Sequence, residues 1–323
     1  MKKQIIASFV KNTSCLENIL CTILKSENND KDADHRMLFL DHWHMNYNDE
    51  YFDFGDKIKF FDDYMVNKLL ENFRSYYGMD YNYEYQVKSF NYNDLMEMFK
   101  LHDFVILCID AFELKNLALY KKYHVPHYVL ITDVNKDGIN CIDYAEELLL
   151  DIDHYNRGAI YFIYINSGAK KINPCLWALN LEKRIEIILQ TKIVFNNIRK
   201  FADELNNTNK LYKELNSVLK DDVLLLRLPH NLTLIGSSRY HFNRAVQNIP
   251  NIPLTAKASE NEMDIISKLW FDIIKKIIKF KFNYDTKIIF DIQKTIIMLC
   301  EKEENLAQNL LKFLKLERSN FDR

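Results

Sequence analysis

The sequence predicts an α+β fold in which an antiparallel β-sheet is followed by a mainly helical region. One observation is a series of short apolar or alternating segments between residues 103 and 166, which is typical of strands. The other is a series of long patterns with apolar residues three and four positions apart, all after residue 170. The change of character near Asn173-Pro174 predicts two domains, residues 1–170 and 171–323.

Local patterns give the order of the elements. The first part is expected to hold a short edge strand at 4–9, a helix at 14–25, a strand or buried segment at 37–47, and helices at 62–78 and 92–101. Strands are then expected at 103–110, in the two halves of 123–144, and at 158–166. Helical patterns follow at 176–207, 209–219, 260–282 and 285–315.

Composition excludes several classes of function. The 323 residues include 43 Lys and Arg against 45 Asp and Glu, whereas a dedicated nucleic-acid binder shows a basic excess. Only six glycines are present, and no glycine-rich loop that cradles nucleotide phosphates occurs. No apolar run approaches the ~18 residues that span a bilayer, and no signal peptide is evident, so a cytoplasmic protein without membrane contact is expected. Its six cysteines are expected to be free thiols.

Cys15 is the first candidate for chemistry. In VKNTSCLENIL, Ser14 precedes the apolar periodicity and Glu17 follows three residues later, which is the pattern of a capping box. Cys15 then occupies the first helical position, where the helix dipole and free N–H groups favour a thiolate. The same N–H groups would stabilise an oxyanion on a carbonyl that Cys15 attacks. The alternative is a small buried cysteine in a capped helix.

The stretch YHVPHYVLITDVNKDGINCIDY predicts a hairpin that can supply a base and an orienting group. With a turn centred near Asn135, His127 would lie directly opposite Asp143, with Cβ atoms ~4.5–5.5 Å apart. The strongest turn signal, Asp137-Gly138, comes slightly later. A tight two-residue turn there places the two side chains on opposite faces, so the pair requires a looser loop or a β-bulge. Otherwise, a histidine at a strand start is a surface or packing residue.

Together these features resemble the papain-like cysteine enzymes, which combine a cysteine at the start of an N-terminal helix with a strand-initial histidine and a later aspartate. The segments TSCLENILCTIL, FVILCIDAFELKNLALYKKYHVPHYVLITDV and INCIDY are similar to the N-terminal domain of the butirosin-biosynthesis H family. In that family an aspartate-ended strand is followed by a loop, then H-x-x-H opening a strand, then an aspartate. The resemblance covers about residues 10–145, and the helical half adds no motif.

The resemblance implies a papain-like domain with Cys15 as nucleophile, His127 as base and acid, and Asp143 as the orienting carboxylate. His124, the first histidine of H-x-x-H, would have no catalytic role.

The oxyanion site departs from the pattern. Papain-like enzymes usually place a glutamine six residues before the cysteine, and here that residue is Phe9. Asn12 is the nearest amide and is therefore the expected oxyanion group, together with the Cys15 backbone N–H.

Members of this family move an acyl group from a carrier-protein thioester to an amine, forming an amide in the biosynthesis of peptide-like secondary metabolites. The resemblance implies the same activity here, with an acyl or peptidyl carrier protein and a small amine acceptor as partners. A homodimer is left open. No cofactor or metal is expected, because 4′-phosphopantetheine enters only on the carrier protein, and the thioester makes an ATP site unnecessary.

Two further segments are candidates for roles in such a reaction. The lysines of KKIIKFKF, 275–282, would suit an acidic carrier protein, or are the solvated face of an ordinary helix. Either the helical domain or the aromatic tract FFDDYMVNKLLENFRSYYGMDYNYEY would keep water from an acyl-enzyme. The tract alternatively forms ordinary core and loop.

Three alternatives stay open. A cysteine peptidase or amidase would use the same residues with water as the second nucleophile. A zinc-binding protein would use imidazoles, although no known zinc spacing supports it; the histidines considered are His35, His42, His44, His124 and His127. The third alternative is a non-catalytic interaction module on an inactive enzyme fold.

Overall fold

The computed structural model describes residues 4–11, 13–60, 62–85, 89–168, 171, 173, 176–217, 226–249 and 260–321. The chain forms two compact units. The sheet unit comprises Met1–Leu38 and Leu69–Ile172, and the helical unit comprises Phe39–Lys68 and Asn173–Arg323. Among the described helices, none is both long and apolar enough to cross a membrane.

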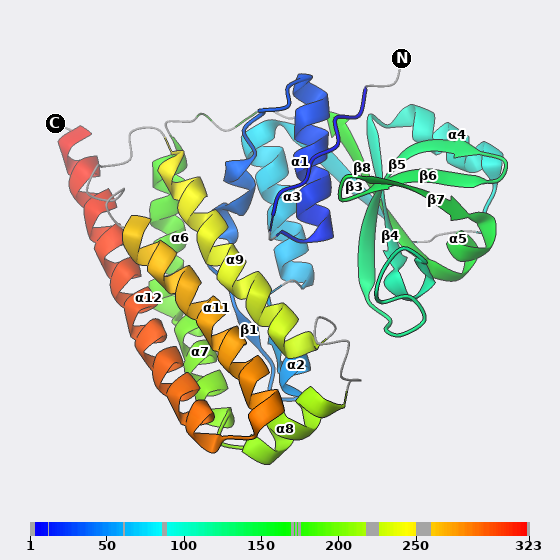
Figure 1. Cartoon of the computed structure of the whole chain (residues 1–323). Helices are drawn as coiled ribbons and strands as arrows, with labels where there is room; N and C mark the ends of the chain where they lie inside the picture. Colours follow the sequence, from blue (N-terminus) through cyan, green and yellow to red (C-terminus); the bar gives the residue numbers. More distant parts are fainter. Residues whose placement is uncertain are drawn as a thin grey trace. The chain divides into compact units, whose positions relative to one another are not determined.

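A six-stranded antiparallel sheet forms the centre of the sheet unit, in the order β3-β8-β4-β5-β6-β7 (Figure 1). The strands are β3 (Met79–Glu84), β4 (Phe104–Asp110), β5 (Pro126–Asn135), β6 (Gly138–Asp143), β7 (Glu146–Asp151) and β8 (Ala159–Ser167). This confirms the predicted antiparallel sheet and its main strands. The sequence patterns missed β3 and β7, whose side chains are largely polar or exposed and so carry no clear apolar run.

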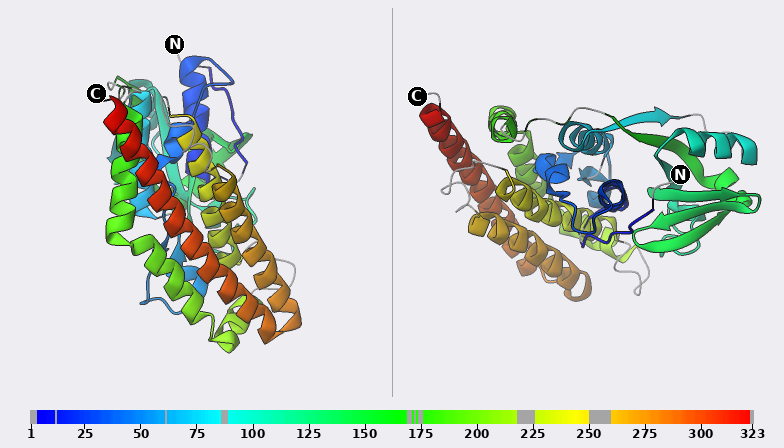
Figure 2. Two further views of the ribbon diagram at one scale, coloured as in Figure 1. Left: turned by 90° about the vertical axis from the view of Figure 1, so that its left-hand side faces the viewer. Right: turned by 90° about the horizontal axis from the view of Figure 1, so that it is seen from above.

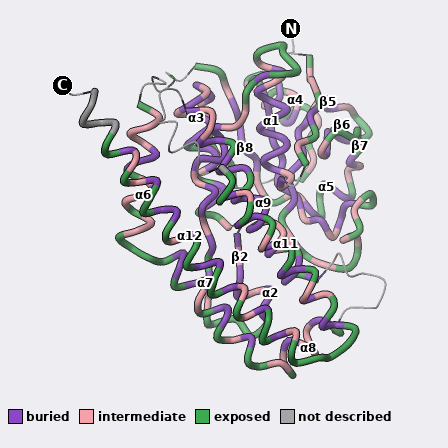
Figure 3. The backbone as a smooth tube through the Cα atoms, turned by 60° about the vertical axis from the view of Figure 1, so that its left-hand side comes forward, coloured by how far each residue is buried: buried purple, intermediate pink, exposed green. Residues whose placement is uncertain are grey.

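Helices lie on both faces of this sheet. One face packs against α4 (Tyr92–Leu101) and α5 (Ile152–Gly158) around a core that includes Phe99, Val129 and Tyr155. On the side of β5, α1 (Cys15–Asn28) contacts the sheet. Helix α1 is buried over most of its length, as Figure 3 shows. Cys15, the candidate nucleophile, is therefore the first residue of a helix that is fixed by burial against its neighbours.

The N-terminal segment does not form the expected edge strand. Alternate backbone N–H groups of residues 4–11 instead donate to three side chains on one face of α1. The pairs are Ile6 to Ser26 at 2.8 Å, Ser8 to Thr22 at 3.0 Å and Val10 to Asn18 at 2.7 Å. The spacing matches because two extended residues and four helical residues both advance about 6–7 Å. The segment thus runs antiparallel along α1 and leads directly into the loop before Cys15.

The helical unit holds most of the predicted helices. It contains α6 (Trp177–Thr191), α7 (Ile193–Glu204), α8 (Thr208–Asn216), α9 (Arg227–Gln247), α11 (Glu260–Asn283) and α12 (Thr286–Phe321). In Figures 1 and 2, α11 runs between α9 and α12 and contacts both. The expected helix at 176–207 is divided at Lys192, which adopts a left-handed conformation. Helix α9 was not predicted because its pattern mixes polar and apolar residues.

The division between the units differs from the expected one at residues 39–68. This stretch holds β1 (Asn46–Tyr47), β2 (Ile58–Lys59) and α2 (Phe54–Lys57), together with the first part of α3 (Asp63–Tyr77). Side chains from the helical segments bind its backbone and side chains: Asn197 donates to the Met45 carbonyl at 2.8 Å, and Lys57 pairs with Glu204 at 2.6 Å. Residues 39–68 are therefore grouped with the helical unit.

The segment expected at 37–47 as a strand or buried stretch is mainly a 3-10 helix, Arg36–Asp41, followed by β1. Its apolar side chains are buried, and burial from all directions removes the alternation that would distinguish a strand from a helix. Helix α3 ends at Tyr77, directly before Gly78 at φ 72°, as the sequence predicted.

Candidate active site

A β-bulge brings His127 and Asp143 to the same face of the sheet. The β5–β6 turn is a tight one, with Asn135 paired with Gly138. A register shift around Thr132 then changes the pairing, so that Leu130 lies opposite Ile142. The bulged strand supplies one additional residue, which reverses the face on which His127 lies relative to β6. The bulge that the His127–Asp143 pair required is therefore present.

The two side chains meet diagonally rather than directly opposite each other. His127 is paired with Ile109 of β4. The outermost β5–β6 pair is Leu130 with Ile142, which lies three residues from His127 on β5 and one residue from Asp143 on β6. His127 Nε2 nevertheless lies 2.9 Å from Asp143 Oδ1, and both side chains are buried. The turn lies at Lys136-Asp137, slightly later than Asn135, and the bulge compensates for this displacement.

Helix α1 presents the thiol of Cys15 to the same imidazole. The capping box is formed as predicted: Ser14 N donates to Glu17 Oε2 at 2.5 Å, and Glu17 N donates to Ser14 Oγ at 3.3 Å. Cys15 is half-buried, and its thiol acts on His127 through both a hydrogen bond and its charge. Because Nε2 of His127 faces Asp143, the ring nitrogen left for the thiol is Nδ1.

The electrostatics of His127 favour an imidazolium. Burial alone would lower the pKa of His127, but the charge of Cys15 and the hydrogen bonds that the ring makes to Asp143 and Cys15 outweigh it and raise the pKa to about 10. At neutral pH, the imidazole is therefore protonated beside the thiol sulfur, which is the charge arrangement of a nucleophilic cysteine.

Asn116 is a second partner of Asp143 that the sequence did not indicate. Its Nδ2 lies 3.4 Å from Asp143 Oδ2, the oxygen that His127 does not contact. Asn116 lies in the loop that joins β4 to β5, and no spacing or motif in the sequence marks it as a site residue. With both oxygens engaged, the Asp143 carboxylate has a fixed orientation.

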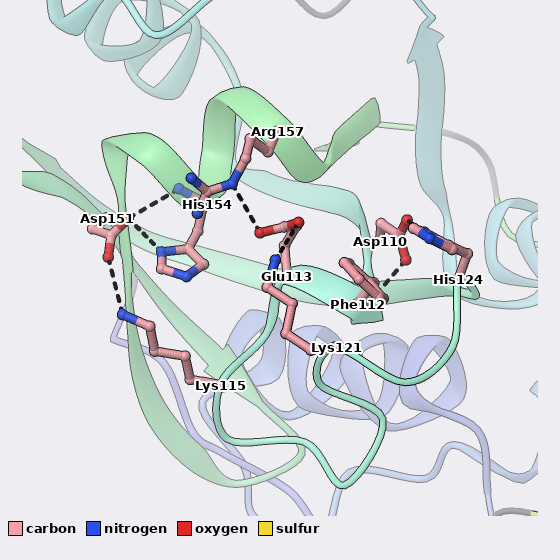
Figure 4. A network of polar contacts seen from close by, with 9 residues as sticks. All are labelled: Asp110, Phe112, Glu113, Lys115, Lys121, His124, Asp151, His154 and Arg157. Atoms are coloured by element: carbon pink, nitrogen blue, oxygen red, sulfur yellow. Dashed lines mark hydrogen bonds and ion pairs between the residues drawn. The ribbon is translucent and has the colours of Figure 1, made fainter.

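A polar network holds this loop in place, as Figure 4 shows. The buried Glu113 accepts from Lys121 at 2.7 Å and from Arg157 of α5 at 3.0 Å. At the base of the loop, His124 lies 2.6 Å from Asp110. The loop ends just before His127, so these contacts position the two ends of the segment that carries Asn116.

One aromatic ring borders the imidazole, and a second ring packs against the first. Tyr144 directly follows Asp143, and its ring centroid is 6.3 Å from that of His127 and 6.1 Å from that of Phe9. Its backbone φ of 53° is uncommon for a residue with a side chain, and such conformations often occur at functional sites. Burial, and then the charges of Cys15 and Asp143, raise the pKa of Tyr144, so its phenol stays neutral.

The remaining predicted residues lie as follows. Asn12 lies outside the described residues, and Phe9 is 65% exposed. His124 is exposed and pairs with Asp110, away from the Asp143 carboxylate that His127 contacts. Among the described residues, no group of three or more histidine, cysteine or acidic side chains is placed to hold a metal ion.

Comparison with known proteins gives no family for this chain. No protein-family model matches the sequence, and no curated protein matches it significantly.

The pKa of His127 predicts a pH-dependent contribution to stability. Its folded-state pKa is raised from 6.5 to about 10, so the contribution is fully present below pH 6.5 and is lost as the pH rises through about 10. At ~1.4 kcal/mol per pKa unit, the upper limit is about 5 kcal/mol. We expect His127→Gln to lower the free energy of unfolding most at pH 6 and least near pH 10.5, as measured by urea denaturation.

The variant Cys15→Ala provides a control for the cause of this effect. In its background, His127→Gln should cost less at pH 6, because the charge of Cys15 is the largest influence that raises the His127 pKa. A cost of His127→Gln that is equal at pH 6 and pH 10.5 would contradict the assignment.

Proposed function

We propose that this protein is a cysteine-dependent acyltransferase that forms an amide, with Cys15 as nucleophile, His127 as base and acid, and Asp143 as the orienting group. The observation that carries the proposal is the convergence of three elements. The first residue of α1 supplies the thiol, β5 the imidazole, and the end of β6 the carboxylate 2.9 Å from that imidazole. Covalent acyl transfer requires a nucleophile, a base that contacts it, and a group that orients the base.

The chemistry follows from this arrangement. The Cys15 sulfur attacks the carbonyl carbon of an acyl thioester, the bond to the donor sulfur breaks, and His127 gives its proton to the departing thiolate. The acyl group is then bound to Cys15. An amine attacks the acyl carbon, His127 accepts the amine proton, and the Cys15 thiolate leaves as the amide forms. In the first turn of α1, the Glu17 N–H donates to Ser14 Oγ, and the N–H groups before it lack intrahelical acceptors and are suited to the developing oxyanion.

Transfer rather than hydrolysis is supported by the surroundings of the site. Only 3% of Asp143 and 7% of His127 are exposed, and the Tyr144 ring lies beside that of His127. Limited access for water favours attack by an amine on the acyl-enzyme. The donor is proposed to be a carrier-protein thioester and the acceptor a small amine, on the strength of the sequence resemblance. The papain-like identity of the sheet unit belongs to the same proposal.

The lysines of KKIIKFKF offer only partial support as a carrier-docking face. Lys275 is exposed and pairs with Asp272 at 3.0 Å, but Lys281 is buried. A docking surface on α11 would therefore use Lys275, Lys276 and Lys279 and not the full set.

The test is incubation of the protein with an acyl-pantetheine thioester, with and without an amine, followed by intact-mass analysis and product detection. We expect a mass increase equal to one acyl group on the protein, and conversion to the amide when the amine is added. Release of the free acid at the same rate with or without amine would favour a hydrolase. Cleavage of a peptide substrate without amide formation would identify a peptidase.

A further inference from the structure

Four tyrosines form a continuous row across the sheet, on the face opposite the core beneath α4 and α5. We call Tyr128, Tyr161, Tyr83 and Tyr85 the tyrosine row. They come from β5, β8 and β3 or its end, and on β5 and β8 they alternate with the core residues Val129 and Phe162. The ring centroids are 6.2 Å apart from Tyr128 to Tyr161, 5.9 Å from Tyr161 to Tyr83 and 5.5 Å from Tyr161 to Tyr85.

The inner end of the row lies at the candidate active site. Tyr128 directly follows His127 in β5, so their Cα atoms are ~3.8 Å apart. Its hydroxyl is 2.6 Å from the hydroxyl of Tyr161. Burial, and then the charges of neighbouring groups that include Cys108 and Cys15, raise the pKa of Tyr128, which places it within electrostatic reach of the thiol.

Exposure increases along the row from the inner end to the outer one. Tyr128 is 4% exposed, Tyr161 and Tyr83 are half-buried, and Tyr85 is 69% exposed. A ligand lying on the row would therefore extend from solvent to the neighbourhood of Cys15. Tyr83 and Tyr85 also belong to the aromatic tract at 60–85, and their rings stack on each other with centroids 5.4 Å apart.

We propose that the tyrosine row binds the extended arm of the acyl donor, a pantetheine-type chain; this inference rests on the proposed function. From β5 across β4 and β8 to β3, the row spans three interstrand spacings, roughly 14 Å. That length suits a long arm and exceeds what a small amine acceptor needs. Aromatic faces pack against methylene groups, and tyrosine hydroxyls pair with amides, which are the two kinds of group that alternate along such an arm.

The test compares two donors of the same acyl group, an acyl-pantetheine thioester and an S-ethyl thioester that lacks the arm. The measured quantity is kcat/KM for acylation of Cys15, with the acylated protein detected by intact-mass analysis. We expect the wild-type protein to prefer the long donor. Tyr85→Ala should lower the rate with the long donor on the order of tenfold and leave the short donor unchanged. Tyr85→Phe should keep most of the preference, because it retains the ring.

Tyr240→Ala is the matched control, since Tyr240 is a partly exposed tyrosine of α9 in the helical unit. It should change neither rate. Equal rates for both donors in the wild type, or an equal loss with both in Tyr85→Ala, would overturn the role of the row while leaving acyl transfer intact.

Failure of both donors to acylate Cys15 would instead count against the proposed function. Calorimetric titration of the protein with pantetheine alone then tests the row independently. Binding that Tyr85→Ala weakens about tenfold supports the row, and an absence of binding by the wild-type protein overturns it.

Discussion

The Cys15→Ala variant is expected to form no acyl adduct and to lose thioester turnover by about 10⁴-fold or more. The methyl group cannot form the covalent intermediate, and the imidazolium of His127 loses the thiol that acts on it. Removing a half-buried sulfur at the first helical position should change the free energy of unfolding by no more than about 1 kcal/mol. Intact mass after exposure to the donor, product formation and urea denaturation measure these three quantities.

Cys21→Ala is the matched control on the same helix. Cys21 is fully buried, and burial raises the pKa of its thiol, so it stays protonated and inaccessible. This variant should keep the adduct on Cys15 and most of the turnover, at the cost of some stability. An adduct that persists in Cys15→Ala, or that disappears in Cys21→Ala, would remove the basis for Cys15 as nucleophile.

How much of this site was predictable depends on the range of the interactions involved. The start of α1 is set by contacts within four residues, and the capping box of Ser14 and Glu17 was readable directly. The His127–Asp143 pair depends on the parity of a hairpin, and one inserted residue changes that parity. The sequence pattern indicated that a β-bulge was needed, but no residue near Thr132 indicated where the bulge would lie.

Residues that act through the folded loop left no signal at all. Asn116 reaches Asp143 only because Glu113, Lys121 and Arg157 hold the loop between β4 and β5. Arg157 is far along the chain from that loop, and no periodicity connects the two. Such contacts become visible only in three dimensions, because neither propensity nor local pattern contains them.

The same limit explains the position of residues 39–68. The apolar stretch at 37–47 correctly predicted that its side chains are buried, but it did not predict which elements they pack against. Arg239 Nη1 donates to the His44 carbonyl at 2.7 Å, so a charged side chain from α9 fixes the backbone of a segment almost two hundred residues earlier. A buried arginine is uncommon and requires partners that a single sequence does not identify.

The partner of Arg239 is Glu303, and the second large effect is expected from its substitution. We expect Glu303→Gln to lower the free energy of unfolding by about 3–5 kcal/mol. Glu303 and Arg239 are both fully buried, and the guanidinium donates to both carboxylate oxygens at 3.0 Å. The indole N–H groups of Trp43 and Trp270 donate to the same carboxylate, at 2.7 and 3.1 Å. An amide cannot accept all four bonds, and it leaves the Arg239 charge buried without a counter-ion.

Two comparisons identify the cause of that loss in urea denaturation. Asp272→Asn breaks an exposed pair with Lys275 and should cost less than about 1 kcal/mol. The double variant Arg239→Met with Glu303→Leu removes both charges, so it should recover a large part of the stability that Glu303→Gln loses, since apolar replacement of a buried pair is often close to neutral. If the double variant is as unstable as Glu303→Gln, the loss comes from packing and from the unpaired indoles rather than from the isolated arginine charge.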